Sequence, residues 1–190
     1  MNTTIGSGEH CHFGVVHGRF QPLHLGHMEY LLAAKALCSF LFVGITNPDP
    51  LLTAFDSSNP HRSELDSNPF TYFERQRMIE ASMRDEGISH SEFCVVPFPI
   101  NFPERIKYYA PVGACYFVTI YDDWGRTKTR LLQELGLRVQ VLWERPMTDR
   151  LTSGSEVRGL MRRDGEWSHL VPPGVLRAVR DLDIDVRRSS

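Results

Sequence analysis

Residues 17–27, HGRFQPLHLGH, constrain the fold of this chain more than any other stretch. The apolar run at 13–16 predicts a short buried strand, and residues 28–37 carry apolar side chains at the spacing of one helical face. A strand, a tight loop and a helix make a natural phosphate site, because the first helical N–H groups lack partners within the helix and the dipole favours anions. His24 and His27 lie at this helix start, where imidazoles can donate hydrogen bonds to phosphate oxygens. The simpler interpretation is a strand–helix turn with core histidines.

The rest of the chain alternates apolar, β-branched runs with helical patterns. We expect strands at about 12–17, 40–46, 93–97, 113–120 and 137–142, and helices at about 26–38, 68–85 and 122–135, with a short one after 101. Asn101 is the expected N-cap of the short helix, and Asp122 or Asp123 that of the next helix. Apolar strands separated by helices indicate an α/β fold with a doubly wound parallel sheet. Ligands of such sheets bind at the carboxyl ends of the strands, where the strand order switches.

A second candidate anion site lies at residues 152–158, TSGSEVR. Ser153 and Ser155 place hydroxyls at a predicted helix start, and Arg158 follows about one turn later. A guanidinium in that position can hold a phosphate through two parallel hydrogen bonds. The alternative is a plain serine N-cap followed by a solvated arginine.

Composition limits the class of protein. The chain has 190 residues, a net charge of −2, and 42% hydrophobic and 23% charged residues, as expected for a globular domain without a nucleic-acid partner. We expect a disordered tail at 1–11 and a single domain at 12–190, with a C-terminal helical segment at about 154–182. No apolar run reaches the ~20 residues of a membrane span, and residues 1–12 lack a signal-peptide pattern, so we expect a cytoplasmic protein with no membrane partner. We also expect a homo-oligomer, with reduced cysteines at 11, 38, 94 and 115.

The pattern Gly-x-Phe-x-Pro-x-His-x-Gly-His over 18–27 resembles the signature of the nucleotidyltransferase superfamily, and residues 152–158 resemble its second motif, in the right order. Residues 68–75, NPFTYFER, and 165–175 further resemble the archaeal-type nicotinamide-mononucleotide adenylyltransferases. The resemblance implies a Rossmann-like nucleotidyltransferase fold.

It also implies a reaction, in which an acceptor phosphate attacks the α-phosphorus of a nucleoside triphosphate and releases pyrophosphate. The main expectation is an adenylyltransferase of NAD biosynthesis that uses ATP and nicotinamide mononucleotide. One alternative is a cytidylyltransferase that uses CTP and a small phosphate or phosphonate, and another is a catalytically inactive nucleotide-binding regulator.

The implied roles fall on both motifs. The catalytic candidates are His24, His27 and Arg158, and the candidates for binding the nucleotide and its phosphates are Gly18, Arg19, Phe20, Gly26, Ser153 and Ser155. We expect Mg²⁺ as the cofactor, held by substrate phosphates and water rather than by a protein metal site.

Two regions depart from the adenylyltransferase pattern, and both should contact the acceptor. Residues 121–126, YDDWGR, replace an Asn-rich turn, and Trp124 with Asp123 is the candidate for binding the acceptor, with the indole stacking on a flat ring. The alternative is that Trp124 covers the sheet edge as a structural residue. The polar stretch at 47–68 is longer than expected, and we predict that it forms a lid over the substrate.

Overall fold

The fold is built on one parallel sheet of five strands in the order β3-β2-β1-β4-β5. The structure, a computed structural model, describes residues 10–49 and 68–187. The strands are β1 (Cys11–Gly18), β2 (Cys38–Ile45), β3 (Phe93–Pro97), β4 (Cys115–Ile120) and β5 (Arg138–Glu144). The order switches between β1 and β4, which pair in parallel through Gly14 and Val15. The predicted doubly wound α/β fold is therefore confirmed.

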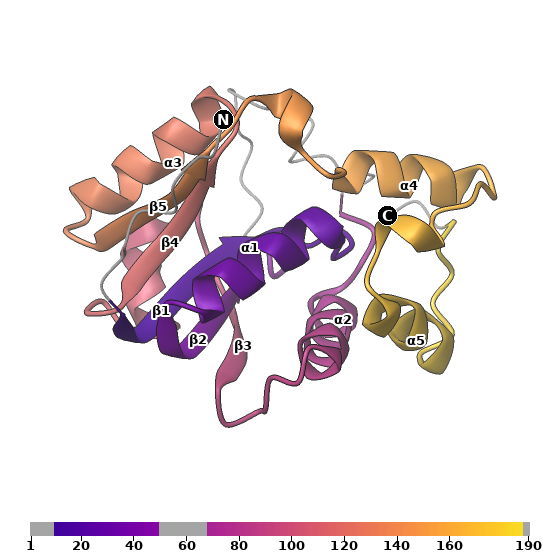
Figure 1. The fold of residues 1–190 in the computed structure, drawn as a ribbon, viewed down its shortest axis with the longest axis horizontal. Coiled ribbons are helices and arrows are strands. Elements are labelled where there is room, and N and C mark those ends of the chain that lie inside the picture. Colours follow the sequence, from indigo (N-terminus) through magenta and orange to yellow (C-terminus); the bar gives the residue numbers. More distant parts are fainter. Residues whose placement is uncertain (1–9, 50–67, 188–190) are drawn as a thin grey trace.

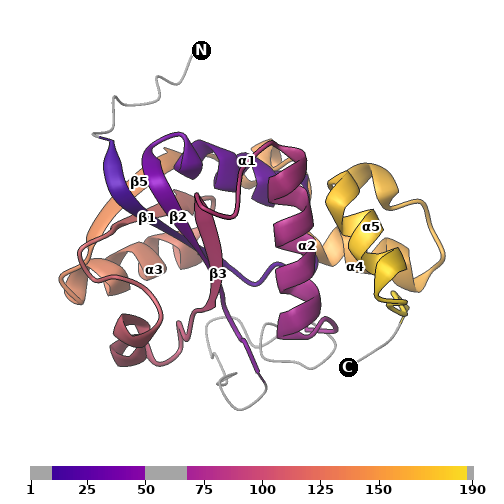
Figure 2. The same ribbon diagram turned by 90° about the horizontal axis from the view of Figure 1, so that it is seen from below.

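Helices cover both faces of this sheet (Figures 1 and 2). Those that follow the strands are α1 (Leu25–Lys35), α2 (Tyr72–Asp85), the 3-10 helix η4 (Pro103–Tyr108) and α3 (Asp123–Glu134). After β5 come η5 (Met147–Asp149), α4 (Gly154–Arg162), η6 (Ser168–Leu170) and α5 (Pro173–Asp181). Figure 2 shows α4 and α5 beyond α2, on the side of α2 away from the sheet.

Alternate residues of β1 divide the core into two layers, because successive strand side chains point to opposite faces. Val16 belongs to the layer formed with α1 and α2, including Leu31 and Met78. Val15 belongs to the other layer, with Leu132 of α3 and residues of η4. His17 follows on the same face as Val15, which places its side chain on the α3 side of the sheet.

Three predicted element boundaries are corrected. The first helix ends at Lys35 rather than near 38, because Cys38 already begins β2. α2 begins at Tyr72 rather than near 68, because Thr71 caps it in a capping box with Glu74. Asn101 is not a helix cap: η4 has no side-chain cap, and the Asn101 amide donates to Asn47 Oδ1 at 3.4 Å.

The N-terminal prediction meets the described chain only at its end. Residues 1–9 lie outside the described part, and Cys11, the last residue of the predicted tail, begins β1 and is buried. All four cysteines are free, as predicted. In the described ranges, no helix is both long and apolar enough to pass through a membrane.

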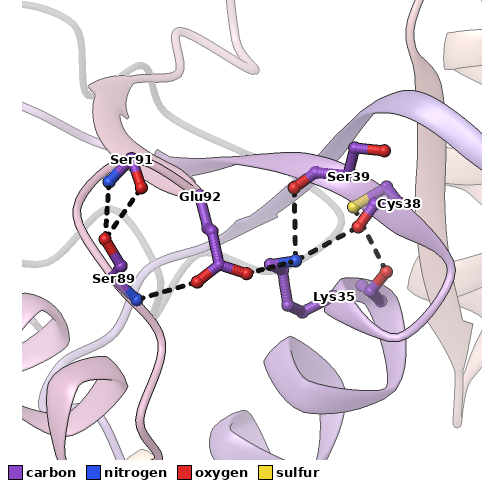
Figure 3. A network of polar contacts seen from close by, with 7 residues as sticks. Lys35, Cys38, Ser39, Ser89, Ser91 and Glu92 are labelled. Carbon is purple, nitrogen blue, oxygen red and sulfur yellow. Dashed lines mark hydrogen bonds and ion pairs between the residues drawn. The ribbon is translucent and has the colours of Figure 1, made fainter.

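Lys35 joins the end of α1 to two strands (Figure 3). Its ammonium donates to the carbonyls of Cys38 and Ser39 at 3.2 Å each and pairs with Glu92 at 3.2 Å. The Glu92 carboxylate also accepts from the Ser89 N–H, which holds the pKa of Glu92 below its usual value. The contacts fix α1 relative to the starts of β2 and β3, at the end of the strands opposite the predicted phosphate loop.

Candidate active site

A pocket opens at the carboxyl ends of the strands, where the strand order switches between β1 and β4. Its volume is about 200 Å³. The lining residues already predicted to bind substrate are Gly18, Arg19, Phe20, His24, Gly26, His27, Trp124 and Arg158. The structure thus brings residues from both motifs to one cavity.

His24 is the N-cap of α1, and this fixes the position of its proton. Nδ1 of His24 accepts a hydrogen bond from the His27 N–H at 3.3 Å. A neutral imidazole that accepts at Nδ1 carries its proton at Nε2, so His24 can donate from Nε2 to a ligand oxygen. The ring of His27 stacks on that of His24, with the centroids 3.6 Å apart.

Burial keeps the two imidazoles neutral. The pKa of His24 is lowered to about 3, mainly by burial and additionally by the nearby Arg150 and Arg158. Burial also holds the pKa of His27 well below its usual value, with His24, Arg150, Arg19 and Lys128 adding to the shift. Nδ1 of His27 has no hydrogen-bond partner within the described chain. The site therefore presents uncharged donors surrounded by cations, which is an environment suited to a polyphosphate.

Phe20 packs against the ring of His27. Its side chain is fully buried, and its ring meets that of His27 edge-on at a centroid distance of 4.8 Å. A Cβ at Gly18 would lie 3.0 Å from the Phe20 ring, so the glycine makes room for the aromatic side chain. The structure thus gives Phe20 a packing contact beneath the loop, in addition to its place in the cavity wall.

Arg158 connects the second motif to the first. Its two terminal guanidinium nitrogens donate to the Gln21 carbonyl at 2.6 Å and to Ser155 Oγ at 3.3 Å. The predicted two-point hold on phosphate stays a prediction, and the side chain lines the cavity. Ser153 is the N-cap of α4 and accepts from the Glu156 N–H, and neither Ser153 nor Ser155 lines the cavity. Gly154 lines it instead.

Sequence reasoning missed the residues that hold the loop in place. The side-chain amide of Gln21 donates to the Phe70 carbonyl and accepts from the Phe70 N–H, both at 2.9 Å. The buried guanidinium of Arg75 donates to the carbonyls of Arg19 and Thr46 at 2.9 Å and of Asn47 at 2.8 Å. Burial lowers the pKa of Arg75 to about 10, and the guanidinium remains charged at neutral pH. The only sequence signal for Arg75 is its place in the 68–75 resemblance.

Two further cations were also missed. Lys128 of α3 and Arg150, just before the second motif, both line the cavity. Neither belongs to a motif, and no spacing rule connects them to the histidines.

Only one of the two residues predicted to bind the acceptor lines the cavity. Trp124 lines the cavity, whereas the Asp123 side chain is fully exposed and pairs with Arg126 at 3.5 Å. Asp122 lines the cavity and caps α3 by accepting from the Gly125 N–H at 2.8 Å. The structure therefore does not place Asp123 in the site. The predicted lid spans 47–68, of which 50–67 lie outside the described residues, so only its ends, such as Asn47, can be placed.

Few of the described side chains near the cavity could bind a metal ion directly. Among residues 10–49 and 68–187, no group of three or more His, Cys, Asp or Glu could hold a metal ion. Asp122 is the one carboxylate among the described residues of the lining, and its Oδ1 is engaged as a helix cap. A divalent ion bound in this cavity would therefore be held by substrate phosphates and water more than by side chains of the described residues.

Comparison with known proteins decides the family. The family model described as cytidylyltransferase-like matches residues 15–160. The chain belongs to this family. This cytidylyltransferase-like protein is thus a nucleotidyltransferase, as its two motifs indicate.

The sequence is more similar to a cytidylyltransferase than to an adenylyltransferase among the relatives compared. The chain is 51% identical over 174 residues to a phosphonoformate cytidylyltransferase from Streptomyces viridochromogenes, covering 92% of this chain and 94% of the relative. It is 30% identical over 169 residues to a nicotinamide-nucleotide adenylyltransferase from Methanolobus tindarius, covering 87% and 86%. The resemblance to archaeal adenylyltransferases is therefore real but more distant.

A solved structure supports the fold. A bifunctional NMN adenylyltransferase/ADP ribose pyrophosphatase from Francisella tularensis, complexed with AMP and a manganese ion, superposes with a TM-score of 0.63 at 14% identity. The match covers 92% of this chain and 50% of that one, so this chain spans about half its length. The Rossmann-like nucleotidyltransferase fold is confirmed.

The preference for an adenylyltransferase is wrong. The relative at 51% identity is a cytidylyltransferase, whereas the adenylyltransferase relative from Methanolobus tindarius stands at 30%. The motifs could not separate the two activities, because the phosphates that they are predicted to contact are common to ATP and CTP. The expected role in NAD biosynthesis depended on the adenylyltransferase function and is withdrawn with it.

Proposed function

We propose that this protein is a cytidylyltransferase that transfers CMP from CTP to a small phosphonate acceptor. The observation that carries the proposal is the 51% identity with a phosphonoformate cytidylyltransferase over nearly the full length of both chains. Phosphonoformate is a phosphonate with a carboxylate bonded directly to phosphorus, so it has no ring for Trp124 to stack on. We therefore assign Trp124 to the acceptor wall of the cavity without a stacking role.

The reaction needs charge neutralisation and positioning rather than a base. A phosphonate oxygen, already anionic, attacks the α-phosphorus of CTP; a new P–O bond forms, and the bond to the β-phosphate oxygen breaks. The pyrophosphate leaves with that electron pair. Catalysis of such transfers rests on alignment and on stabilising the charge that develops on the phosphoryl oxygens.

The residues of both motifs provide these functions. His24, through its Nε2–H, and His27 would donate to the transferring phosphoryl group at the start of α1. Arg19, Arg158 and the Gly154 end of α4 would hold the remaining phosphates, and Ser153 and Ser155 would support them from the same helix. Bound Mg²⁺ would supply positive charge between the phosphates.

The decisive measurement is pyrophosphate release by the purified protein. CTP, ATP, GTP and UTP are each combined with phosphonoformate, methylphosphonate and nicotinamide mononucleotide, with Mg²⁺ or Mn²⁺ present and after chelation. We expect turnover with CTP and a phosphonate, and its loss on chelation. Turnover with ATP and nicotinamide mononucleotide alone would contradict the proposal. Nucleotide binding without pyrophosphate release would instead indicate the inactive regulator.

The homo-oligomer expected from the sequence stays a prediction. The mass of the purified protein in solution tests it directly.

A further inference from the structure

His17 is a buried polar residue that the proposed mechanism does not use. It lies at the end of β1 with 5% of its surface exposed, and it lines the cavity. Neither ring nitrogen has a hydrogen-bond partner in the described part of the chain. A buried polar group left unpaired costs about 1–3 kcal/mol, so a position like this calls for a partner that the protein itself does not supply.

The ring of His17 is held in one orientation. It stacks on the ring of Phe98, with the centroids 4.7 Å apart and the planes 12° from parallel. Phe98 is fixed in turn, because its N–H donates to the Ile45 carbonyl at 2.8 Å and its ring fills the space above Gly44. A Cβ at Gly44 would lie 2.7 Å from that ring. With one face covered by Phe98, the imidazole is set to bind through its nitrogens.

The chemistry of this position favours an anion. The pKa of His17 is lowered to about 3, mainly by burial and additionally by Lys128, so the ring is neutral at pH 7 and offers one N–H donor. Lys128 also lowers the pKa of His27, so its ammonium is within electrostatic range of both imidazoles. An anion beside His17 would therefore lie near the Lys128 ammonium and next to an oriented N–H donor.

His17 and Lys128 lie at the α3 face of the sheet, whereas most residues predicted to bind phosphates lie at the other face. His17 shares a face of β1 with Val15, which packs in one layer with Leu132 of α3, the helix that carries Lys128. His24 and Arg158 come from the starts of α1 and α4. The cavity thus has two halves, one at each face of the sheet.

We propose that His17 and Lys128 form an acceptor subsite that binds a carboxylate, so that the preferred acceptors are phosphonocarboxylates. This deepens the proposed cytidylyltransferase function and rests on it. The carboxylate accepts from the imidazole N–H and the Lys128 ammonium, and the phosphonate oxygens of the same small molecule face His27 and the α-phosphate of CTP. A simple alkylphosphonate leaves the subsite empty.

The test compares two acceptors in matched variants. His17→Phe keeps a stacked aromatic ring but removes the donor, and Lys128→Met removes the charge while keeping most of the side-chain length. Arg130→Met, on an exposed position of α3 outside the cavity, is the control. Each is assayed with CTP and either phosphonoformate or methylphosphonate, and thermal unfolding checks that each is folded.

We expect His17→Phe and Lys128→Met to raise the KM for phosphonoformate about 10- to 100-fold, the value of a hydrogen bond to a charged group. The KM for CTP and the turnover of methylphosphonate should change far less than the KM for phosphonoformate, and His17→Gln should recover part of the phosphonoformate affinity through its amide. Arg130→Met should match the wild type with both acceptors.

A binding measurement separates a subsite from a structural role. In ¹⁵N-histidine NMR spectra of the wild type, phosphonoformate should shift the His17 ring signals, assigned from their loss in His17→Phe, and methylphosphonate should not. Equal losses for both acceptors, or unchanged His17 signals, would overturn the subsite and leave the cytidylyltransferase function standing. If the wild type releases no pyrophosphate from CTP with any phosphonate, the proposed function fails and the subsite falls with it.

Discussion

The two ring nitrogens of His24 have different roles. Nδ1 caps α1 by accepting from the His27 N–H, which leaves the proton on Nε2 for a ligand. The cap and the ligand contact depend on the same neutral tautomer, because a protonated ring has no acceptor nitrogen. The low pKa that burial imposes on His24 therefore protects the helix start as well as the donor.

His27→Ala should lower kcat by about 10²–10³-fold, the usual cost of losing one donor to the charge that develops in a transition state. His169→Ala is the matched control, because His169 is exposed and lies outside the cavity. Pyrophosphate release measures kcat, and circular dichroism establishes that both variants fold. Wild-type turnover in a folded His27→Ala protein would refute the role assigned to His27.

Arg158→Lys should lower kcat/KM for CTP by on the order of tenfold, because an ammonium cannot reproduce the fork that reaches the Gln21 carbonyl and Ser155 Oγ together. Arg162→Lys, at an exposed position of the same helix, should leave kinetics unchanged. Steady-state kinetics with varied CTP measures both. Identical constants for Arg158→Lys and the wild type would mean that the arginine only contacts the Gln21 carbonyl and Ser155 and has no part in binding CTP.

Among the elements, α5 approaches α2 more closely than any side chain would allow. A Cβ at Gly174 would lie 2.4 Å from the backbone nitrogen of Ser82. Arg177 of α5 also forms an ion pair with Asp85 at the end of α2. The C-terminal helices thus rest on the helix that supplies Arg75 to the phosphate loop.

Gly174→Ala should lower the free energy of unfolding by about 1–3 kcal/mol, because the α2 backbone cannot yield to the added methyl group. Gly159→Ala is the control: a Cβ there has only the flexible end of Arg163, at 3.9 Å, within 4 Å. It should stabilise α4 by about 0.4–1 kcal/mol. Urea denaturation measures both changes, and equal effects of the two substitutions would contradict the close approach.

At the scale of the whole molecule, distant segments converge on the loop at residues 19–21. Arg158 reaches the Gln21 carbonyl across 137 positions of sequence, and Arg75 reaches the Arg19 carbonyl across 56. The backbone of this loop is held by hydrogen bonds from two helices. The site can therefore form only when the sheet and both helices have folded.

Stability should fall when the pH drops from 7 to 5. Burial lowers the pKa of His17 and His24 to about 3, whereas both titrate near 6.5 in the unfolded chain. Between pH 6.5 and 3 the unfolded state binds more protons, so acidification favours unfolding, by roughly 2 kcal/mol for each histidine at pH 5. Urea denaturation at the two pH values measures the loss, and His17→Phe should reduce it. A free energy of unfolding that is the same at pH 5 and 7 would be inconsistent with buried neutral histidines.

The sequence determined the parts of this protein that depend on local chemistry. Apolar runs and helical spacing predict the parallel sheet, and the two motifs predict where phosphates bind, because strand period, turn residues and helix starts act over a few neighbouring positions. The errors near 38, 68 and 101 concern boundaries. The start of β2 at Cys38 limits the first helix, the Thr71–Glu74 capping box sets the start of α2, and at Asn101 a contact from elsewhere in the fold decides, because its amide donates to Asn47 Oδ1.

Only the tertiary structure decided which other residues complete the site. Three different elements carry His17, Lys128 and Arg75, and no sequence spacing predicts that these residues lie at the same edge of the sheet. The motifs could not identify the acceptor, because they are predicted to contact phosphates that all these substrates share. The wall of the cavity, where an acceptor would be distinguished, is assembled by folding from segments far apart in sequence.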